Sequence, residues 1–315
     1  MTLFKLKVIF ISLLAIFLMG AVEASQEASL SVSPLIREIE IEPGASWTGH
    51  VEVFNSNPEE FDFKVSVMDF VGRGEGYAHF LQRSKLDGYA LSDWISFQDE
   101  KVTIGPGESH KFLFTVDVPE EAAPGGIYAG IIATAAEEDE EGSGMAVAPS
   151  VSSLLFVNIE GEYYEKIDIL DFSTNSLFYD KIEIPFNVKI MNMGNVHVRP
   201  EGSVAVLRGE EELFAKKINP HKGYGNILPN TERNWNFLWE DEDSIFNTGK
   251  YQAKLDLTYG RDEKRKISET IEFWVIPSKR QLVLLAIFLV ALLLSIVRVS
   301  LVYYRFYHKK KESLD

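Results

Sequence analysis

The sequence of 315 residues contains no cysteine. The chain therefore cannot form a disulfide, a thiol nucleophile, an iron–sulfur cluster or a cysteine-ligated zinc site. A lipid attached to cysteine is excluded for the same reason. The sequence also contains no Asn-x-Ser/Thr acceptor site for N-glycosylation.

Positive charge is scarce, with 31 Lys and Arg against 47 Asp and Glu, a net charge of −16 and a pI near 4.9. Nucleic acid is excluded as an expected partner, because binding to a phosphate backbone depends on Lys and Arg. The 46% of hydrophobic residues is enough to build buried cores. The length allows roughly two ordinary domains.

The N-terminus has the features of a secretory signal peptide. Residues 1–7 carry two Lys, residues 8–19 are apolar apart from one Ser, and small residues occupy the −3 and −1 positions before a cleavage site. We predict a signal peptide over residues 1–24, cleaved between Ala24 and Ser25. An uncleaved N-terminal anchor is the alternative.

The C-terminal region predicts one transmembrane helix over residues 281–304. As a helix, the apolar run 282–304 would be about 34 Å long, enough to cross a bilayer core of about 30 Å. Arg298 lies in its last third, where the side chain can extend toward the headgroups. Arg305 and three Lys at 309–311 place the tail 305–315 in the cytoplasm. A buried helix of a soluble domain is the alternative.

These two ends predict a single-pass type I protein of the cell membrane with its main part outside the cell. Residues 25–278 contain 22 basic and 44 acidic residues, so the expected extracellular part is strongly acidic. Export without cysteine or glycosylation sites indicates a prokaryotic protein.

Alternation with a period of two dominates the region between the two ends. Apolar residues recur at every second position in several segments, which is typical of half-buried antiparallel strands; these include Val51 and Val53, Phe112 to Val118, Val204 and Val206, and Tyr251 to Leu257. Turn signals rich in Pro, Gly and Asn separate them. We predict an all-β protein with two tandem immunoglobulin-like β-sandwich domains, at 25–161 and 162–277.

Chemistry-bearing motifs are few. The acidic runs 137–141 and 240–243 are interpreted as solvated surface, and the six His lack the spacing of a metal pair, so we predict no metal and no cofactor. No nucleophile motif G-x-S-x-G occurs. We therefore predict that the protein is not an enzyme. The alternative requires a concave site that contains Asp69, Asp93 or Asp99 with a raised carboxylate pKa.

The segment 72–92 is too long for a simple turn and is rich in aromatic residues. Together with the Trp that follows, it supplies the candidate ligand-binding residues Tyr77, Phe80, Arg83, Tyr89 and Trp94. Long loops with aromatic and Arg side chains often bind ligands, here an envelope glycan or a partner protein. The alternative is a compact loop whose aromatic side chains fold back onto the core.

Several segments resemble the WxL-interacting protein family. The segments 31–34, 36–44, 49–57, 94–96, 105–109 and 116–128 are similar to its peptidoglycan-binding domain. The segments 192–202 and 227–239 resemble, more loosely, the second, host-binding domain. The C-terminal helix and basic tail follow in the same order. The resemblance implies contacts with peptidoglycan and with WxL-domain proteins at a Gram-positive-type cell surface.

These observations predict a non-catalytic, membrane-anchored cell-surface binding or scaffold protein that contacts peptidoglycan, another envelope glycan or a surface protein. An alternative is an assembly scaffold or chaperone-like module that pairs β-strand edges with surface polymers. This alternative predicts an edge strand without a neighbour. An enzyme that acts on wall glycans is the least favoured hypothesis.

Overall fold

The computed structural model describes residues 30–73, 77–81, 90–136, 149–221, 225–242, 245–262 and 265–312. The predicted signal peptide and its cleavage site, the acidic run 137–141, and the candidate residues Arg83 and Tyr89 lie outside these residues.

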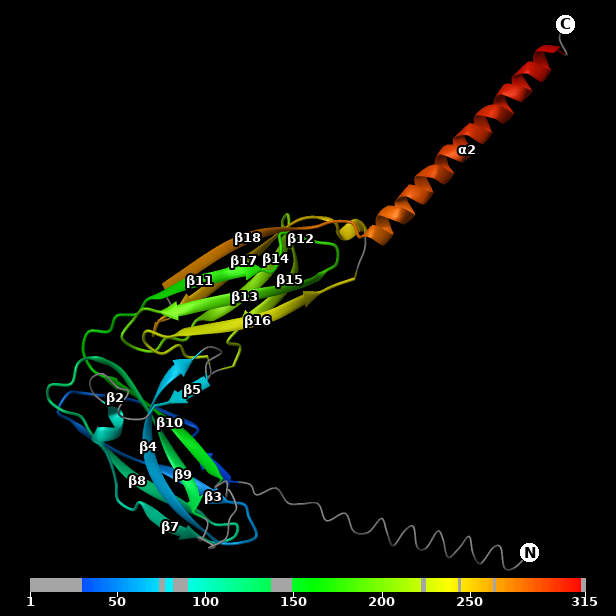
Figure 1. The fold of residues 1–315 in the computed structure, drawn as a ribbon. Helices are drawn as coiled ribbons and strands as arrows, with labels where there is room; N and C mark the ends of the chain where they lie inside the picture. Colours follow the sequence, from blue (N-terminus) through cyan, green and yellow to red (C-terminus); the bar gives the residue numbers. More distant parts are fainter. Residues whose placement is uncertain are drawn as a thin grey trace, which may run out of the picture. The chain divides into compact units, whose positions relative to one another are not determined.

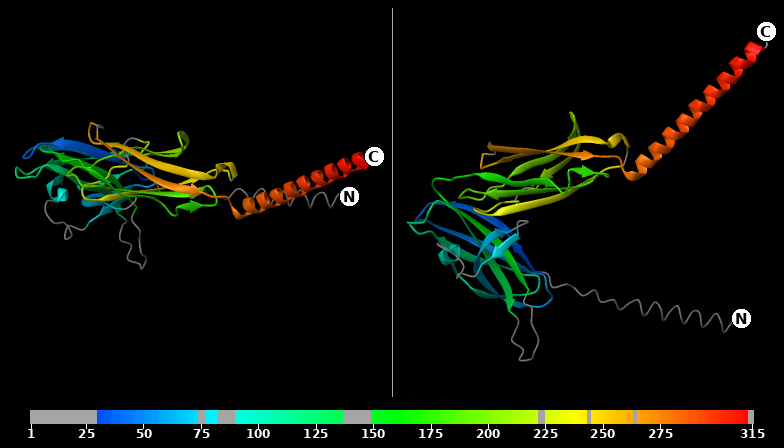
Figure 2. Two further views of the ribbon diagram at one scale, coloured as in Figure 1. Left: turned by 90° about the horizontal axis from the view of Figure 1, so that it is seen from above. Right: turned by 45° about the horizontal axis from the view of Figure 1, so that its top comes forward.

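The chain forms two compact β-rich units (Figures 1 and 2), and the all-β, immunoglobulin-like prediction is confirmed. The first unit consists of residues up to 69, 82–122 and 128–157. The second consists of residues 70–81, 123–127 and 158–315. The predicted domain boundary at 161 lies three residues after the start of the long segment of the second unit.

The first sandwich contains two sheets. The four-stranded sheet has the order β1 (Leu30–Ser33), β3 (Ser46–Asn55), β8 (Ser109–Asp117) and β6 (Ile95–Phe97). The other has the order β2 (Ile36–Ile41), β10 (Ser150–Ile159), β9 (Gly125–Ala136), β4 (Phe61–Arg73) and β5 (Tyr77–Phe80), and β7 (Lys101–Ile104) also pairs with β4. A short 3-10 helix, η2 (Leu91–Trp94), precedes β6.

Alternation in the sequence becomes the core of this sandwich. Val51 and Val53 of β3 are buried opposite residues of β8, and Phe112, Phe114 and Val116 of β8 are buried on the same face. Successive side chains of a strand point to opposite faces, so one apolar set of each strand enters the core. The predicted alternation in these strands is confirmed.

The second sandwich has a smaller and a larger sheet. The smaller has the order β11 (Ile167–Thr174), β13 (Glu183–Asn192) and β16 (Glu232–Glu240). The larger has the order β12 (Phe178–Tyr179), β18 (Arg265–Val275), β17 (Gly249–Tyr259), β14 (Glu201–Arg208) and β15 (Glu211–Ile218). A 3-10 helix, η3 (Ile245–Asn247), lies between β16 and β17.

Aromatic rings fill the core of the second sandwich. Phe186 of β13 stacks on Phe237 of β16 with 5.5 Å between ring centroids, and Trp239 lies 5.6 Å from Tyr251 of β17. Tyr251 in turn stacks on Phe273 of β18 at 5.7 Å. Because these rings come from both sheets, they join the two layers through ring contacts and shared burial.

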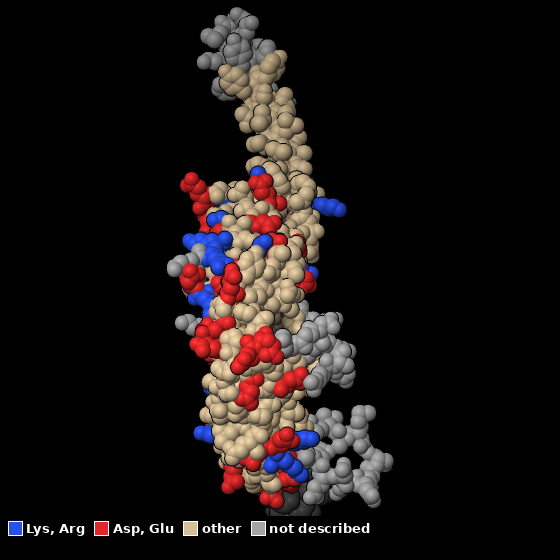
Figure 3. Space-filling model, turned by 90° about the vertical axis from the view of Figure 1, so that its left-hand side faces the viewer, with Lys and Arg blue, Asp and Glu red and all other residues tan. Residues whose placement is uncertain are grey.

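One long helix, α2 (Lys279–Glu312), follows β18 almost directly. Within its segment Lys279–Tyr304, an 18-residue window has a mean hydropathy of 3.0 and is not buried, so the helix is long and apolar enough to cross a membrane. Figure 3 shows Asp and Glu side chains over the visible faces of the sandwiches and a nearly uncharged helix surface. The helix includes the predicted span 281–304 and continues to Glu312.

Candidate strand-pairing edge

Each of the two sandwiches has a buried asparagine at the end of a ten-residue strand. Asn55 ends β3 and Asn192 ends β13, and both side chains are fully buried. The Asn55 backbone donates to Glu108 O at 2.9 Å and accepts from Gly107 N at 2.8 Å. The Asn192 backbone donates to Thr231 O at 3.0 Å and accepts from Asn230 N at 2.9 Å. This shared pattern makes β8 and β16 equivalent strands.

The registers confirm the equivalence. Leu30 of β1 pairs with Asn55, and Ile167 of β11 pairs with Asn192. β8 and β16 each have nine residues and begin directly after the residue that bonds the asparagine. Each sandwich therefore contains the same three strands in the same order, β1-β3-β8 in the first and β11-β13-β16 in the second.

The two sheets differ at the next position. In the first unit, β6 pairs with Phe114, Thr115 and Val116 of β8, and Gln98 N donates to Leu113 O at 3.0 Å. In the second unit, β16 is the last strand of its sheet within the part of the chain that the structure describes. The residues of β16 equivalent to the β6-binding segment are Phe237, Leu238 and Trp239. The second unit thus presents an edge that the first unit covers with its own chain.

Backbone groups at this edge have a defined direction. Thr231 O accepts from Asn192 N, and Asp241 N donates to Ile182 O, so odd-numbered residues of this segment point their backbone groups at β13. Backbone direction alternates along an antiparallel strand. The even-numbered residues of β16 therefore direct their N–H and C=O groups to the open side; they are Glu232, Asn234, Asn236, Leu238 and Glu240. We call this row of groups the β16 edge.

The β16 edge lacks the features that usually block strand addition. Its register with β13 runs over nine residue pairs without a bulge, and its interior, 234–239, contains no charge, Pro or Gly. Natural edge strands are commonly short, bulged or charged, which prevents pairing with another chain. The β16 edge is long, regular and uncharged in its interior.

Other edge strands in the described residues do carry such features. β11 has a bulge between Ile169 and Asp171. β15 carries two Glu and two Lys, and its pairing with β14 has a register shift. β1, β5, β6 and β7 have four residues or fewer. β2 has six residues, of which three are charged. Among these edges, β16 is the one best suited to accept an additional strand.

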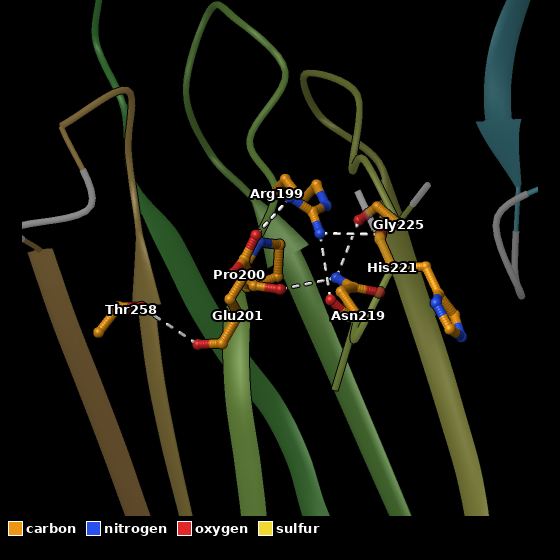
Figure 4. Close-up of polar contacts among 7 residues, drawn as sticks. All are labelled: Arg199, Pro200, Glu201, Asn219, His221, Gly225 and Thr258. Atoms are coloured by element: carbon orange, nitrogen blue, oxygen red, sulfur yellow. Dashed lines mark hydrogen bonds and ion pairs between the residues drawn. The ribbon is translucent and has the colours of Figure 1, made fainter. Parts of the chain in front are cut away.

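A polar cluster holds the connection between β15 and β16 (Figure 4). Arg199 donates from one guanidinium nitrogen to the carbonyls of Asn219 at 3.1 Å and His221 at 2.9 Å, and it forms an ion pair with Glu201. The Asn219 amide donates to Pro200 O at 2.6 Å and to Gly225 O at 3.2 Å. Asn219 has a positive φ of 51°, which Asn tolerates better than most residues.

The same connection is bonded again closer to β16. Val198 and Ile227 exchange two backbone hydrogen bonds, at 3.0 and 2.8 Å, and the Asn192 amide donates to Ile227 O at 2.8 Å. These contacts fix the backbone ahead of β16. The β16 edge is therefore preorganised, which lowers the entropy lost when a partner strand binds.

Side chains of β16 also contain unsatisfied polar atoms. Arg233 lies over the Trp235 ring at 5.5 Å, and its burial lowers the pKa of the guanidinium. Its Nε atom and Asn234 Oδ1 are buried without a hydrogen-bond partner among the described residues. Most buried polar groups in proteins are hydrogen-bonded. Both atoms are buried, so they belong to the packing around β16 and are not offered to a ligand that lies along the β16 edge.

The candidate residues expected to bind a ligand are placed only in part. Tyr77 and Phe80 lie on β5, so part of the segment 72–92 forms a hairpin with β4. Phe80 contacts Phe70 with 5.8 Å between ring centroids, and Trp94 is buried at the end of η2. For Phe80 and Trp94, the packing favours the alternative in which aromatic side chains contact the core.

Of the carboxylates considered for catalysis, Asp69 lies on β4, Asp93 in η2 and Asp99 between β6 and β7. Asp69 is buried and accepts hydrogen bonds from the backbone N and the hydroxyl of Ser92, so it links β4 to η2. No three His, Asp or Glu side chains in the described ranges are grouped so that they could hold a metal ion. Asp69 thus has a structural role.

Sequence reasoning missed the β16 edge as a specific site. The sequence contains two Pro-containing turns, at 105–108 and 228–231. The available signal was the difference between the segments that precede them. The first turn is preceded by the apolar segment 95–97, which forms β6, whereas no strand pairs with the equivalent side of β16 in the described residues. An unpaired edge was expected from the assembly hypothesis, but no strand was named.

No protein-family model matches the sequence, and a search of curated proteins gives no match. Solved structures of similar fold include the class 5 fimbriae chaperone CfaA, with 15% identity over 79% of this chain and 100% of that one, at a TM-score of 0.41. A chaperone–tip adhesin complex of CFA/I fimbriae biogenesis has 16% identity over 80% of this chain and 100% of that one, at 0.40. A chain of the CsuC–CsuE complex of Acinetobacter baumannii Csu pili has 12% identity over 79% of this chain and 100% of that one, at a TM-score of 0.37. At these identities the likeness concerns the fold alone.

Proposed function

We propose that the protein is a membrane-anchored, non-catalytic module that binds a surface protein. In this proposal a strand of the surface protein is added to the β16 edge. The observation that carries the proposal is the absence, among the described residues, of a strand beside β16 where β8 has β6. Strand addition supplies affinity through backbone hydrogen bonds and specificity through alternate side chains. This is the assembly hypothesis derived from the sequence, now assigned to one strand.

The occupant we propose is an extended segment of a different protein. A two-fold pairing of β16 with a second copy, centred on Asn236, would place Glu232 opposite Glu240 at both ends. Like charges directly opposite each other destabilise a strand pair. Lys or Arg at the two ends of a foreign segment would instead complement these carboxylates. An apolar side chain between them would lie beside Leu238, which is 48% exposed.

The peptidoglycan hypothesis and the resemblance to WxL-interacting proteins stay predictions. The candidate glycan-binding residues come mainly from the aromatic segment 72–92, of which the described part includes a strand paired with β4 and the start of the 3-10 helix η2. Surface-protein binding through β16 needs no contribution from that segment. Anchoring by α2 is common to both hypotheses.

The test uses the full chain in its native membrane with a photo-cross-linking amino acid at position 238 of β16. The matched control position is 170 of β11, since Leu170 and Leu238 are 46% and 48% exposed and lie on opposite edges of one sheet. We expect an adduct from position 238, but not from 170, that maps to an extended segment of a partner. Leu238→Lys should abolish partner binding, and Leu170→Lys should leave it unchanged.

Hydrogen exchange of the purified complex supplies an independent measurement. Strand addition should protect the amides of Asn234, Asn236 and Leu238, because their N–H groups face the open side. Unchanged exchange at these amides, or equal cross-linking from positions 170 and 238, would contradict the proposal.

A further inference from the structure

Exposed apolar side chains gather at the end of the second sandwich from which α2 departs. Phe246 of η3 is 85% exposed, and the other large apolar side chains at this end are 43–65% exposed; they are Leu177, Phe178, Trp274 and Ile276. We call these five residues the apolar patch. Isolated exposed apolar residues are normal, but a group on neighbouring segments indicates an interaction surface.

Backbone hydrogen bonds and strand pairing bring the residues of the apolar patch together. Trp274 N donates to Leu177 O at 2.8 Å, and Ile276 N donates to Tyr179 O at 2.8 Å, so the segments 177–179 and 274–276 run side by side. Phe178 of β12 pairs directly with Trp274 of β18. Three remote parts of the sequence therefore meet at one end of the sandwich, since η3 ends two residues before Gly249, which pairs with Val275.

The backbone beneath Phe246 is also held in place. Gly249, which follows η3, pairs with Val275 of β18. Arg208 donates to Phe246 O at 2.8 Å, and the Tyr251 hydroxyl donates to Asn247 O at 2.5 Å. The Phe246 side chain is thus presented to solvent by an anchored turn.

The path of the chain identifies the occupant of the apolar patch. Ile276 lies three residues before Lys279, where α2 begins, and three extended residues span at most about 11 Å. The interfacial layer on each side of a bilayer core is about 5–7 Å thick. When α2 crosses the membrane, the apolar patch is therefore within reach of the headgroups of the same leaflet.

We propose that the apolar patch inserts into the headgroup–acyl boundary of the bilayer and forms a second membrane contact beside the transmembrane helix. Trp and Phe are well suited to this layer, where an apolar ring can be buried beside polar headgroups. Residues 25–278 carry twice as many acidic as basic residues, so their net charge opposes attraction to anionic lipids, although Lys279 and Arg280 follow at the start of α2. Burial of apolar surface drives this contact, and it should occur on uncharged lipids.

The absence of cysteine allows a direct test, because a single introduced cysteine can be labelled selectively. The full chain is reconstituted in phosphatidylcholine vesicles with an environment-sensitive fluorophore on Phe246→Cys. Leu35→Cys, at a 57% exposed position of the first unit, is the matched control, and Leu289→Cys in α2 verifies membrane insertion. We expect a severalfold rise in emission and quenching by lipid-attached nitroxide at position 246, but not at position 35.

The outcome separates failure of the apolar patch from failure of the helix. If position 289 reports lipid while position 246 stays as accessible to aqueous iodide as position 35, the proposal is wrong. A response at position 246 that requires phosphatidylserine would also overturn it, because the proposed contact is apolar. A second label on Phe178→Cys should reproduce the result at position 246, since Phe178 belongs to the same surface.

Discussion

Replacement of Asn192 by Ala should destabilise the second sandwich strongly and locally. The Asn192 amide donates to Val196 O and Ile227 O, both at 2.8 Å, and its oxygen accepts from Gly194 N at 2.8 Å. The side chain is fully buried, so Asn192→Ala leaves Val196 O and Gly194 N without these partners, whereas Ile227 O keeps its hydrogen bond from Val198 N. At about 1 kcal/mol or more for each of the two buried groups left unsatisfied, the free energy of unfolding should fall by about 2 kcal/mol.

The assay is hydrogen exchange measured by mass spectrometry on the full chain in detergent micelles, which reports each sandwich separately. Asn192→Ala should accelerate exchange in β11, β13 and β16 and leave β3 and β8 unchanged. Asn55→Ala should do the reverse, because its amide donates to Glu59 O, Ile104 O and Gly105 O in the first unit. The control is the exposed Asn236→Ala, for which a change within about 0.5 kcal/mol is expected.

A loss below about 1 kcal/mol for Asn192→Ala would refute the reasoning, since it would mean that water or a local shift satisfies both groups. Equal destabilisation of both sandwiches by Asn192→Ala would refute it in a different way. It would show that the two units unfold as one. Asn55 and Asn192 would then not stabilise their own sandwiches separately.

Two further predictions concern the acid-side stability and the membrane helix. Hydrogen bonds from Lys101 and Thr103 lower the pKa of Asp62 below its ordinary value of 3.8. The stabilisation of the folded state by these bonds is therefore present above that pH and is lost as the pH falls through the pKa of the folded state. Asp62→Asn should therefore flatten part of the acid-side decline in melting temperature, and an unchanged slope would contradict this. Leu289→Arg places a charge near the middle of α2, at a cost of about 2.5–3.5 kcal/mol for insertion, and should increase release by alkaline carbonate relative to Leu289→Ile.

Local patterns in the sequence were sufficient to predict the strands. The alternation in β8 and β17 follows directly from one buried face, which any sandwich of this kind imposes. The apolar run before Tyr304 was likewise sufficient to predict α2. Each of these features depends on neighbouring residues in the chain, so no knowledge of remote partners was needed.

Features that depend on remote partners could not be predicted in the same way. Asn55 and Asn192 are polar residues at strand ends, where sequence reasoning places turns on the surface, yet both are fully buried because several loops converge on them. The open side of β16 is also invisible to periodicity, because alternation reports which face is buried and not which edge is paired. Trp94 illustrates the same difficulty, since an aromatic residue after a long loop can be buried as readily as exposed.

The β16 edge and the apolar patch together constrain where a partner can bind. β16 ends at Glu240, and the chain then leads to Phe246, so Glu240 is the end of the strand nearest the apolar patch and Glu232 is the end farthest from it. Nine residues at about 3.3 Å each give an edge about 30 Å long. If the apolar patch lies in the headgroup layer, the Glu240 end of the edge is held close to the bilayer, and an antiparallel partner strand begins beside Glu240. A partner should therefore present its segment near the membrane surface, and lengthening the 276–279 connection should weaken binding without altering the edge itself.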